Sequence, residues 1–390
     1  MTHKDSRGEG ARPSHAAPSA SRPSKRGGTA RSDEGDAGRT LTVSGPMDRS
    51  AGTTDAARRA PRRRRRTIAL ALVLLLFGWL AFDKVASIVS PEPAVGHWRS
   101  LEGAQAYARA YDEVMRDLPQ PDATLDVPIS YGSVRVLRWD GTDSGPPALL
   151  LPGHSSGAPM WSENLPSWIG KRTLFALDPI GDAGFSTQSV PLTSYDDQAE
   201  WISETVTGLG SRALAGGRVH AVGHSFGGAN AAIFALRYPE QVASLTLLEP
   251  AFAIEPMSAS TFFWATLTQL PVPQGWKDRA LAEIGGTTVA EVQERTPMSV
   301  MIDTAAQQYS TSLPMPRTLS DDEWRSMRMP LRVDIGGTKS LAGGQEAVDR
   351  IRALLPEAEA KLWPSATHSL PMQEKDTLGP ELLTFWRDNS

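Results

Sequence analysis

The sequence predicts an α/β fold with a mostly parallel central sheet and helices on both of its faces. Short segments that are apolar throughout, such as 148–151, or mostly apolar, such as 242–248, alternate along the chain with segments whose apolar residues recur at helical spacing. A strand that is apolar throughout is typical of a parallel sheet, because helices cover both faces of such a sheet. The chain beyond residue 97 is long enough for one large domain with its own core.

The composition restricts the chemistry that is available. The chain has 390 residues, a formal net charge of −4 and no cysteine. The lack of cysteine excludes disulfides, thiolate catalysis and cysteine-ligated zinc or iron–sulfur sites. Basic residues gather near the N-terminus, and nothing beyond that basic tail indicates nucleic-acid binding, so no nucleic-acid partner is expected.

The N-terminal part has three predicted segments. Residues 1–61 are polar and basic with almost no large apolar side chains, and we predict a disordered tail because such a segment has no core to bury. An arginine cluster follows at 62–66. We predict that residues 67–84 then form a transmembrane signal anchor, because this apolar run has no charge until Asp83 and no polar face.

The charges on either side of this run predict its orientation. Arginines precede it and few charges follow it, so we expect a single-pass membrane protein with a cytoplasmic N-terminus and the main domain outside the cell. The alternative is that residues 67–84 are the core of a cleaved signal peptide, which would give a secreted protein. A second alternative concerns the start: translation from Met47 would leave a normal short basic segment before the run.

Residues 85–120 are predicted to hold a linker and an N-terminal helix, and residues 121–390 the main domain. The helix is either a stalk or a cap on the domain. The domain opens with a hairpin at Tyr131-Gly132, a turn signal between two apolar segments. The predicted strands are 125–129, 133–139, 148–151, 174–177, 219–222, 242–248, 331–335 and 358–362, and the predicted helices are 101–115, 160–169, 197–209, 229–237, 345–355 and 381–387.

A helical cap is predicted at about 251–328, inserted after the sixth strand. This region interrupts the alternation of strands and helices with many prolines between short helical pieces, and it contains the aromatic cluster Phe262-Phe263-Trp264. An insertion at the carboxyl ends of parallel strands lies over the place where such sheets bind ligands. The alternative is a helical packing layer with no role in ligand access.

The stretch Gly223-His224-Ser225-Phe226-Gly227 is the strongest functional signal. It reads Gly-x-Ser-x-Gly between an apolar strand and a helix-forming run, which is the context of a nucleophile elbow. The serine there adopts a strained conformation, so the residues two positions away must lack a Cβ. The alternative is a glycine-rich packing turn.

Together with two further motifs, this stretch makes the chain resemble the serine α/β-hydrolase family over roughly residues 120–390. The other motifs are Pro152-Gly153-His154 and Ala366-Thr367-His368, and the three occur in the order of the family. The resemblance implies an α/β-hydrolase fold and an esterase-like or lipase-like serine hydrolase. Of the seven histidines, His368 alone lies in a loop beyond the nucleophile and the last strand, so elimination makes it the general base.

The acid is less directly indicated. Many members of the family carry it after the seventh strand, but the matching stretch here, 336–340, has no carboxylate. The resemblance offers a second position after the sixth strand, which holds Glu249 in this chain. A carboxylate at the end of so apolar a strand also needs a partner if it is buried. The alternative is an exposed Glu249, with Asp303 or Asp322 from the cap as the acid.

The resemblance also implies an oxyanion hole made by the backbone N–H groups of Phe226 and His154. The family usually has His-Gly in this loop, whereas Pro152 stands in place of that histidine here. The turn from Asp178 to Ser186 resembles the family's Asp-x-x-Gly-x-Gly-x-Ser segment with one extra residue between the glycines. We assign that turn a structural role and no chemistry.

These observations predict a hydrolase that cleaves an ester-type carbonyl substrate through an acyl-enzyme. Ser225, His368 and Glu249 form the predicted triad, and no cofactor or metal is expected because the mechanism needs none. Hydrolysis of amides, thioesters or lactones, cofactor-free perhydrolysis and carbon–carbon bond hydrolysis would use the same residues. The alternative from another class is a non-catalytic, membrane-tethered protein that binds a ligand with the same fold.

Overall fold

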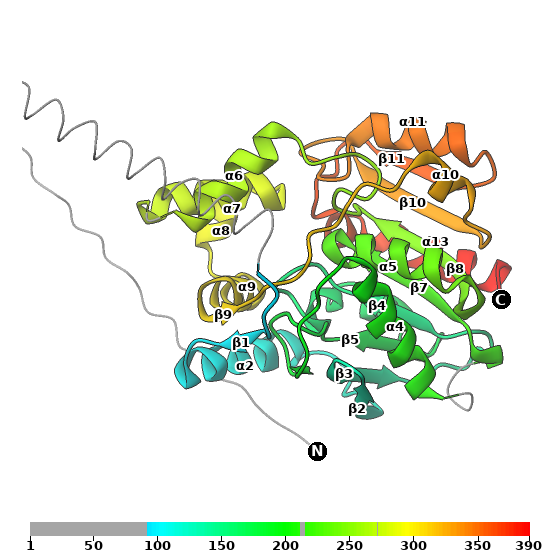
Figure 1. Ribbon diagram of the computed structural model, residues 1–390, viewed down its shortest axis with the longest axis horizontal. Coiled ribbons are helices and arrows are strands. Elements are labelled where there is room, and N and C mark those ends of the chain that lie inside the picture. The colour runs from blue at the N-terminus through cyan, green and yellow to red at the C-terminus, as the bar shows by residue number, and fades with distance from the viewer. Residues whose placement is uncertain (1–91, 211–214, 271) are drawn as a thin grey trace, which may run out of the picture. The chain divides into compact units, whose positions relative to one another are not determined.

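A nine-stranded sheet lies at the centre of the domain in the computed structural model, which describes residues 92–210, 215–270 and 272–390 (Figure 1). Its order is β11-β10-β8-β7-β4-β5-β3-β2, and β6 pairs with β3 beside this path. Strands β11, β10, β8, β7, β4 and β5 run parallel to one another. Strand β3 pairs antiparallel with β5, β2 and β6. The strands are β2 (Ala123–Ile129), β3 (Gly132–Trp139), β4 (Ala148–Leu151), β5 (Leu174–Leu177), β6 (Thr187–Gln188), β7 (Val219–His224), β8 (Val242–Leu248), β10 (Leu331–Gly336) and β11 (Glu359–Trp363).

Helices pack on both faces of the sheet and form two separate cores. Side chains of β4 point alternately to the two faces, so Leu149 and Leu151 lie in one core while Ala148 and Leu150 lie in the other. The first core includes α4 (Asp196–Leu209), α5 (Ser225–Arg237), α10 (Asp321–Arg325) and α11 (Gly344–Leu354). The second includes α2 (Leu101–Met115), α3 (Leu165–Trp168), α9 (Pro297–Gln308) and α13 (Lys375–Asp388). The predicted parallel sheet with helices on both faces is confirmed.

Three local predictions need correction. The helix expected at 160–169 is a 3₁₀ turn, Ala158–Trp161, followed by the short helix α3, with Pro166 in its first turn, where a missing N–H costs no intrahelical hydrogen bond. The last helix begins at Lys375 rather than 381, with Pro380 inside it and the short helix α12 (Leu370–Gln373) before it. Two-residue strands β1 (His97–Trp98) and β9 (Tyr309–Ser310) pair antiparallel and were not predicted.

The N-terminal helix predicted at 101–115 is α2, and it is part of the domain rather than a stalk. It packs against α9 and buries Tyr107 and Tyr111 in the second core. The hydroxyl of Tyr107 donates to the carbonyl of Ala183, 3.2 Å away, in the turn after β5. The pairing of β1 with β9 fixes the same end of the chain against the insertion.

The insertion between β8 and β10 forms the cap. It consists of α6 (Ala259–Gln269), α7 (Gln274–Gly285), α8 (Val289–Gln293), α9 and β9, which lie together at one side of the domain in Figure 1. The predicted cap extended to about residue 328, but α10 belongs to the sheet layer, because it packs beside α11 and buries Trp324 in the first core.

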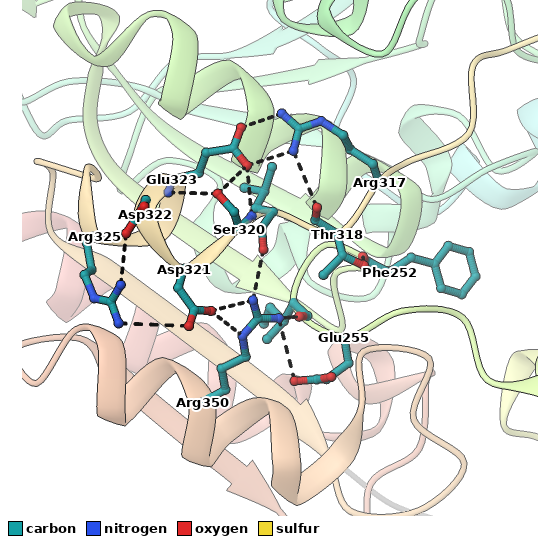
Figure 2. A network of polar contacts seen from close by, with 12 residues as sticks. Phe252, Glu255, Arg317, Thr318, Ser320, Asp321, Asp322, Glu323, Arg325 and Arg350 are labelled. Atoms are coloured by element: carbon teal, nitrogen blue, oxygen red, sulfur yellow. Dashed lines mark hydrogen bonds and ion pairs between the residues drawn. The ribbon is translucent and has the colours of Figure 1, made fainter.

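The two segments that join the cap to the sheet run side by side (Figure 2). The N–H of Leu319 donates to the carbonyl of Ala253 at 2.9 Å, and the hydroxyl of Thr318 donates to the carbonyl of Phe252 at 2.9 Å. Arg350 of α11 donates to the carbonyls of Ile254 and Leu319 and thus holds both segments. Its guanidinium also lies 2.7 Å from Asp321 and 3.7 Å from Glu255.

The three N-terminal predictions fall outside the described residues. They concern the tail at 1–61, the arginine cluster at 62–66 and the anchor at 67–84. Within the described ranges, no helix is both long and apolar enough to cross a membrane.

Candidate active site

Ser225 lies at the turn between β7 and α5 in a conformation that few side chains adopt. Its φ is +55°, in the left-handed region that favours glycine. A Cβ on Gly223 would come within 2.3 Å of the carbonyl oxygen of Gly227, and one on Gly227 within 2.3 Å of the carbonyl oxygens of Leu151 and Pro152. Both positions therefore require glycine, Gly223 because of the backbone of the turn itself and Gly227 because of the end of β4 and the loop after it.

The structure brings Ser225, His368 and Glu249 together from three loops at the carboxyl ends of strands. Ser225 Oγ lies 2.9 Å from His368 Nε2, and His368 Nδ1 lies 3.0 Å from Glu249 Oε2. A carboxylate only accepts hydrogen bonds, so Nδ1 carries the ring proton and Nε2 presents its lone pair to the serine hydroxyl. This is the tautomer that a general base requires.

The Glu249 carboxylate is fully buried and receives donors on both oxygens. Oε1 accepts from the Gly336 N–H and the Ser340 hydroxyl, both at 2.7 Å, and Oε2 accepts from the Leu341 N–H at 3.0 Å in addition to His368. Apart from His368, these donors come from the end of β10 and the loop after it, the stretch in which many members of the family carry their acid. That loop supplies hydrogen bonds to the acid instead of the acid itself.

The two carboxylates that were the alternatives to Glu249 lie elsewhere. Asp303 accepts from Gln307 on its own helix at 2.6 Å, and Asp322 pairs with Arg325 at 3.1 Å with a side chain that is 96% exposed. Neither makes a contact with His368 among the described residues. An exposed Glu249 was the other alternative, and its burial excludes that.

His224, which stands next to the nucleophile, supports the histidine loop. Its Nε2 donates to the backbone carbonyl of His368 at 2.9 Å, and the two rings are 4.9 Å apart. Burial, together with the nearby His368, lowers the pKa of His224 to about 3. His224 is therefore neutral and serves as a hydrogen-bond donor. This role was not predicted, because His368 is distant from it in the sequence.

The expected oxyanion donors lie on either side of Ser225. Phe226 is in the first turn of α5, where backbone N–H groups have no acceptor within the helix. His154 belongs to the loop after β4, and its N–H has no acceptor among the described residues. Gly153 brings this loop against the nucleophile, because a Cβ there would lie 3.3 Å from Ser225 Cβ.

Two carboxylates of the turn after β5 hold this loop. Asp178 accepts from the N–H of Ala158 at 2.8 Å and from that of Phe185 at 2.9 Å, and burial raises its pKa to about 6. Asp182 accepts from the His154 ring at 2.9 Å and from the Ser155 N–H at 2.8 Å. The structural role assigned to this turn from the sequence therefore extends to the active-site loop.

Comparisons with known proteins identify the family and the fold. The model of the "Alpha/beta hydrolase family" matches residues 148–378. The carboxylesterase YbfK of Bacillus subtilis (strain 168) is 23% identical over 289 residues, which are 73% of this chain and 95% of that protein. A second relative from the same organism, named as an uncharacterized carboxylesterase, is 24% identical over 72% of this chain and 92% of its own length.

Solved structures show the same fold. The crystal structure of carboxylesterase CesB (YbfK) from Bacillus subtilis superposes with a TM-score of 0.65, at 23% identity, and covers 73% of this chain and 98% of that one. The structure of naproxen esterase from Bacillus subtilis gives 0.64 at 22% identity and covers 74% and 99%. The names of these relatives agree with the prediction of a hydrolase that acts on ester bonds.

Proposed function

This chain belongs to the alpha/beta hydrolase family, and on that basis we propose that it hydrolyses carboxylic esters through a Ser225-His368-Glu249 triad and an acyl-enzyme intermediate. The observation that carries the proposal is the continuous hydrogen-bond chain from Ser225 Oγ through His368 to the buried carboxylate of Glu249. The carboxylesterases among its relatives support an ester as the substrate class.

In the first half of the reaction, Ser225 Oγ attacks the carbonyl carbon of the ester while its proton passes to His368 Nε2. The carbonyl oxygen takes up the electron pair, and the N–H groups of Phe226 and His154 stabilise the resulting oxyanion. Glu249 stabilises the imidazolium. When the oxyanion collapses, the bond to the alcohol breaks and His368 gives its proton to the departing alcohol oxygen.

In the second half, water attacks the acyl carbon and gives one proton to His368. Collapse of the second tetrahedral intermediate breaks the bond to Ser225 Oγ, which regains its proton from His368, and the carboxylic acid leaves. Water and an ester supply every atom of this cycle. The same groups serve amide or thioester hydrolysis, perhydrolysis and carbon–carbon hydrolysis, but no contact within the described residues favours one of these over ester hydrolysis.

The test is covalent labelling of the purified full-length protein with a fluorophosphonate, which reacts with activated serines. We expect stoichiometric labelling that Ser225→Ala abolishes, together with a loss of p-nitrophenyl butyrate hydrolysis by a factor of about 10⁴ or more. Ser260→Ala, an exposed serine of the cap, is the matched control and should label like the wild type.

Absence of labelling in the folded wild-type protein would contradict the proposal. The protein would then fit the non-catalytic, ligand-binding alternative. Exclusion of the probe by the cap would also prevent labelling. The smaller diisopropyl fluorophosphate distinguishes this case, because it should still label Ser225 if the triad is active.

We also propose that residues 67–84 anchor the protein in the cell membrane with the catalytic domain outside. The support is the uncharged apolar run after the arginine cluster. Protease added to intact cells should digest the domain while the full-length chain sediments with membranes. Recovery of a soluble protein whose N-terminus lies beyond residue 84 would instead establish a cleaved signal.

A further inference from the structure

Two departures from the family pattern meet in the structure beside the nucleophile. The loop after β4 carries its histidine at 154, after Gly153, where the family pattern has histidine before glycine. The turn after β5 has one residue more between Gly181 and Gly184 than the pattern has. Asp182 lies in that longer turn and contacts His154 directly.

Asp182 accepts three hydrogen bonds although it is almost fully buried. Its Oδ2 accepts from His154 Nδ1 at 2.9 Å and from the Ser155 N–H at 2.8 Å, and its Oδ1 accepts from the Ala183 N–H at 2.7 Å. Its side chain is 3% exposed, whereas that of His154 is 43% exposed. The carboxylate therefore lies beneath the loop, and the ring of His154 lies at the surface above it.

The backbone at this point is strained and needs such support. Ser155 has a φ of +63° although it is not glycine, a conformation that persists only where the surroundings fix it. The bond from its N–H to Asp182 fixes the peptide that follows residue 154. The bond from the His154 ring fixes the same residue through its side chain, so Asp182 holds residue 154 at two points.

The held residue, His154, is the one expected to supply the second oxyanion donor. The ring of His154 lies against that of Phe226, with 5.6 Å between the ring centroids, and Gly153 contacts Ser225. The two expected oxyanion donors are thus in residues that pack on each other. An oxyanion donor stabilises the transition state only when it is aimed at the position where the charge develops.

We propose that Asp182 is a positioning residue of the oxyanion hole, which sets the direction of the His154 N–H through the His154 ring and the Ser155 N–H. The inference rests on the proposed esterase function and adds to it a residue that does not touch the substrate. Desolvation on the side of the ring that faces the loop acts to lower the pKa of His154, but the charge of Asp182 and its hydrogen bond to the ring outweigh this and raise the pKa.

The experiment compares Asp182→Asn, His154→Ala and His154→Gln in the full-length protein. An asparagine has one oxygen, so it loses at least one of the three accepted bonds. Rates are expressed per serine titrated by fluorophosphonate, which removes any contribution from unfolded molecules. We expect kcat for p-nitrophenyl butyrate to fall by about 10- to 100-fold in Asp182→Asn and His154→Ala, with KM within about 2-fold of the wild type.

Two variants serve as comparisons. His154→Gln keeps a side-chain donor for Asp182 and should regain most of the activity lost in His154→Ala. Asp126→Asn removes a carboxylate and its ion pair with Arg135, 2.7 Å away, on the β2–β3 hairpin, and should leave kcat unchanged.

The second measurement is inhibition by a trifluoromethyl ketone, which forms a tetrahedral adduct with an oxyanion on the serine. Its inhibition constant should rise in Asp182→Asn by the same factor by which kcat/KM falls. If kcat and this inhibition constant per titrated serine equal those of the wild type, the positioning role is wrong. If the wild type shows no turnover that depends on Ser225, the proposed esterase function itself fails.

Discussion

The sheet loops that carry the triad and the cap that covers one side of the domain are held in different ways. Glu249 receives four hydrogen bonds within the sheet loops, and His368 is fixed by Glu249 and His224. The cap helices α6 and α7 instead expose the large apolar side chains of Phe263 and Trp276, at 56% and 61%. The triad geometry is therefore set within the sheet.

The end of the cap helix α7 contacts the loops of the triad region. The hydroxyl of Ser369, next to His368, donates to the carbonyl of Gly285 at the end of α7 at 2.8 Å. A Cβ on Gly286 would lie 2.6 Å from Thr367. The contrast suggests a division of tasks in which the sheet loops perform the chemistry and the cap controls which molecules reach it. Four predictions test this division.

The largest effect is expected from Glu249→Gln. The neutral amide no longer stabilises the imidazolium and leaves buried donors poorly paired, so kcat should fall by about 10²- to 10⁴-fold with little change in KM. Steady-state kinetics on p-nitrophenyl butyrate measures this. Glu255→Gln, six residues further along the same segment, should change kcat by about 2-fold at most, and equal losses in both variants would contradict the assignment of the acid.

Gly227→Ala and Gly275→Ala compare the same substitution in the first turn of a sheet-layer helix and of a cap helix. A Cβ at Gly227 meets the backbone of the loop after β4, whereas one at Gly275 has open space around it. We expect Gly227→Ala to lower the free energy of unfolding by about 1–3 kcal/mol or more, and Gly275→Ala to raise it by about 0.5–1 kcal/mol. Urea denaturation measures both, and a stable, active Gly227→Ala would be inconsistent with the elbow geometry.

Arg350→Met tests the attachment of the cap. Methionine keeps much of the apolar stem but loses every bond to the two joining segments, so we expect KM to rise about 3- to 10-fold while kcat stays within about 2-fold, because cap order affects substrate capture. Arg352→Met on the same helix is the control, since Arg352 donates to the carbonyl of Ala360, away from the cap. A large drop in kcat with unchanged KM would show that the cap also shapes the triad.

The smallest effect at neutral pH concerns the buried His220 of β7. Burial lowers its pKa to about 3, well below its value of about 6.5 in an unfolded chain. Between pH 6.5 and 3 the His220 ring binds a proton in the unfolded chain but not in the folded one. Its contribution to the free energy of unfolding is therefore fully present above pH 6.5 and is lost as the pH falls toward 3. His220→Gln should make the loss of unfolding free energy between pH 6.5 and 4 shallower.

The control for this loss of unfolding free energy at acidic pH is His97→Gln, at the exposed edge of the domain. Its pH profile should match the wild type. The cap between residues 251 and 320 contains no histidine, so a loss of stability that persists unchanged in His220→Gln would be assigned to another buried histidine, such as His224, or to carboxylates.

Local sequence was sufficient for the elbow and the sheet. Gly223, Ser225 and Gly227 lie two positions apart in one short pattern, and that pattern between a strand and a helix was enough to predict the turn, although the backbone that Gly227 accommodates belongs to Leu151 and Pro152. The apolar composition of the strands likewise predicts that they are buried. The joined hairpin of β2 and β3 and the full length of α2 were predicted for the same reason, since short-range patterns specify them.

Contacts between distant residues decided the rest. Glu249 could be named from the sequence only as one of several acids, because its donors lie about ninety positions away, in the loop after β10. The pairing of β1 with β9 and the position of α10 in the sheet layer likewise have no local signal. These features arise when segments far apart in the chain are packed together.

The sequence by itself determined the fold and singled out Ser225 and His368 as candidate nucleophile and base, because each of these follows from a short pattern and from the order of patterns along the chain. Only the tertiary structure decided which carboxylate pairs with His368, how Asp182 meets His154, and how Arg350 ties the cap to the sheet. A hydrogen bond depends on distances of about 3 Å between atoms. Folding sets those distances for residues whose separation in the sequence says nothing about them.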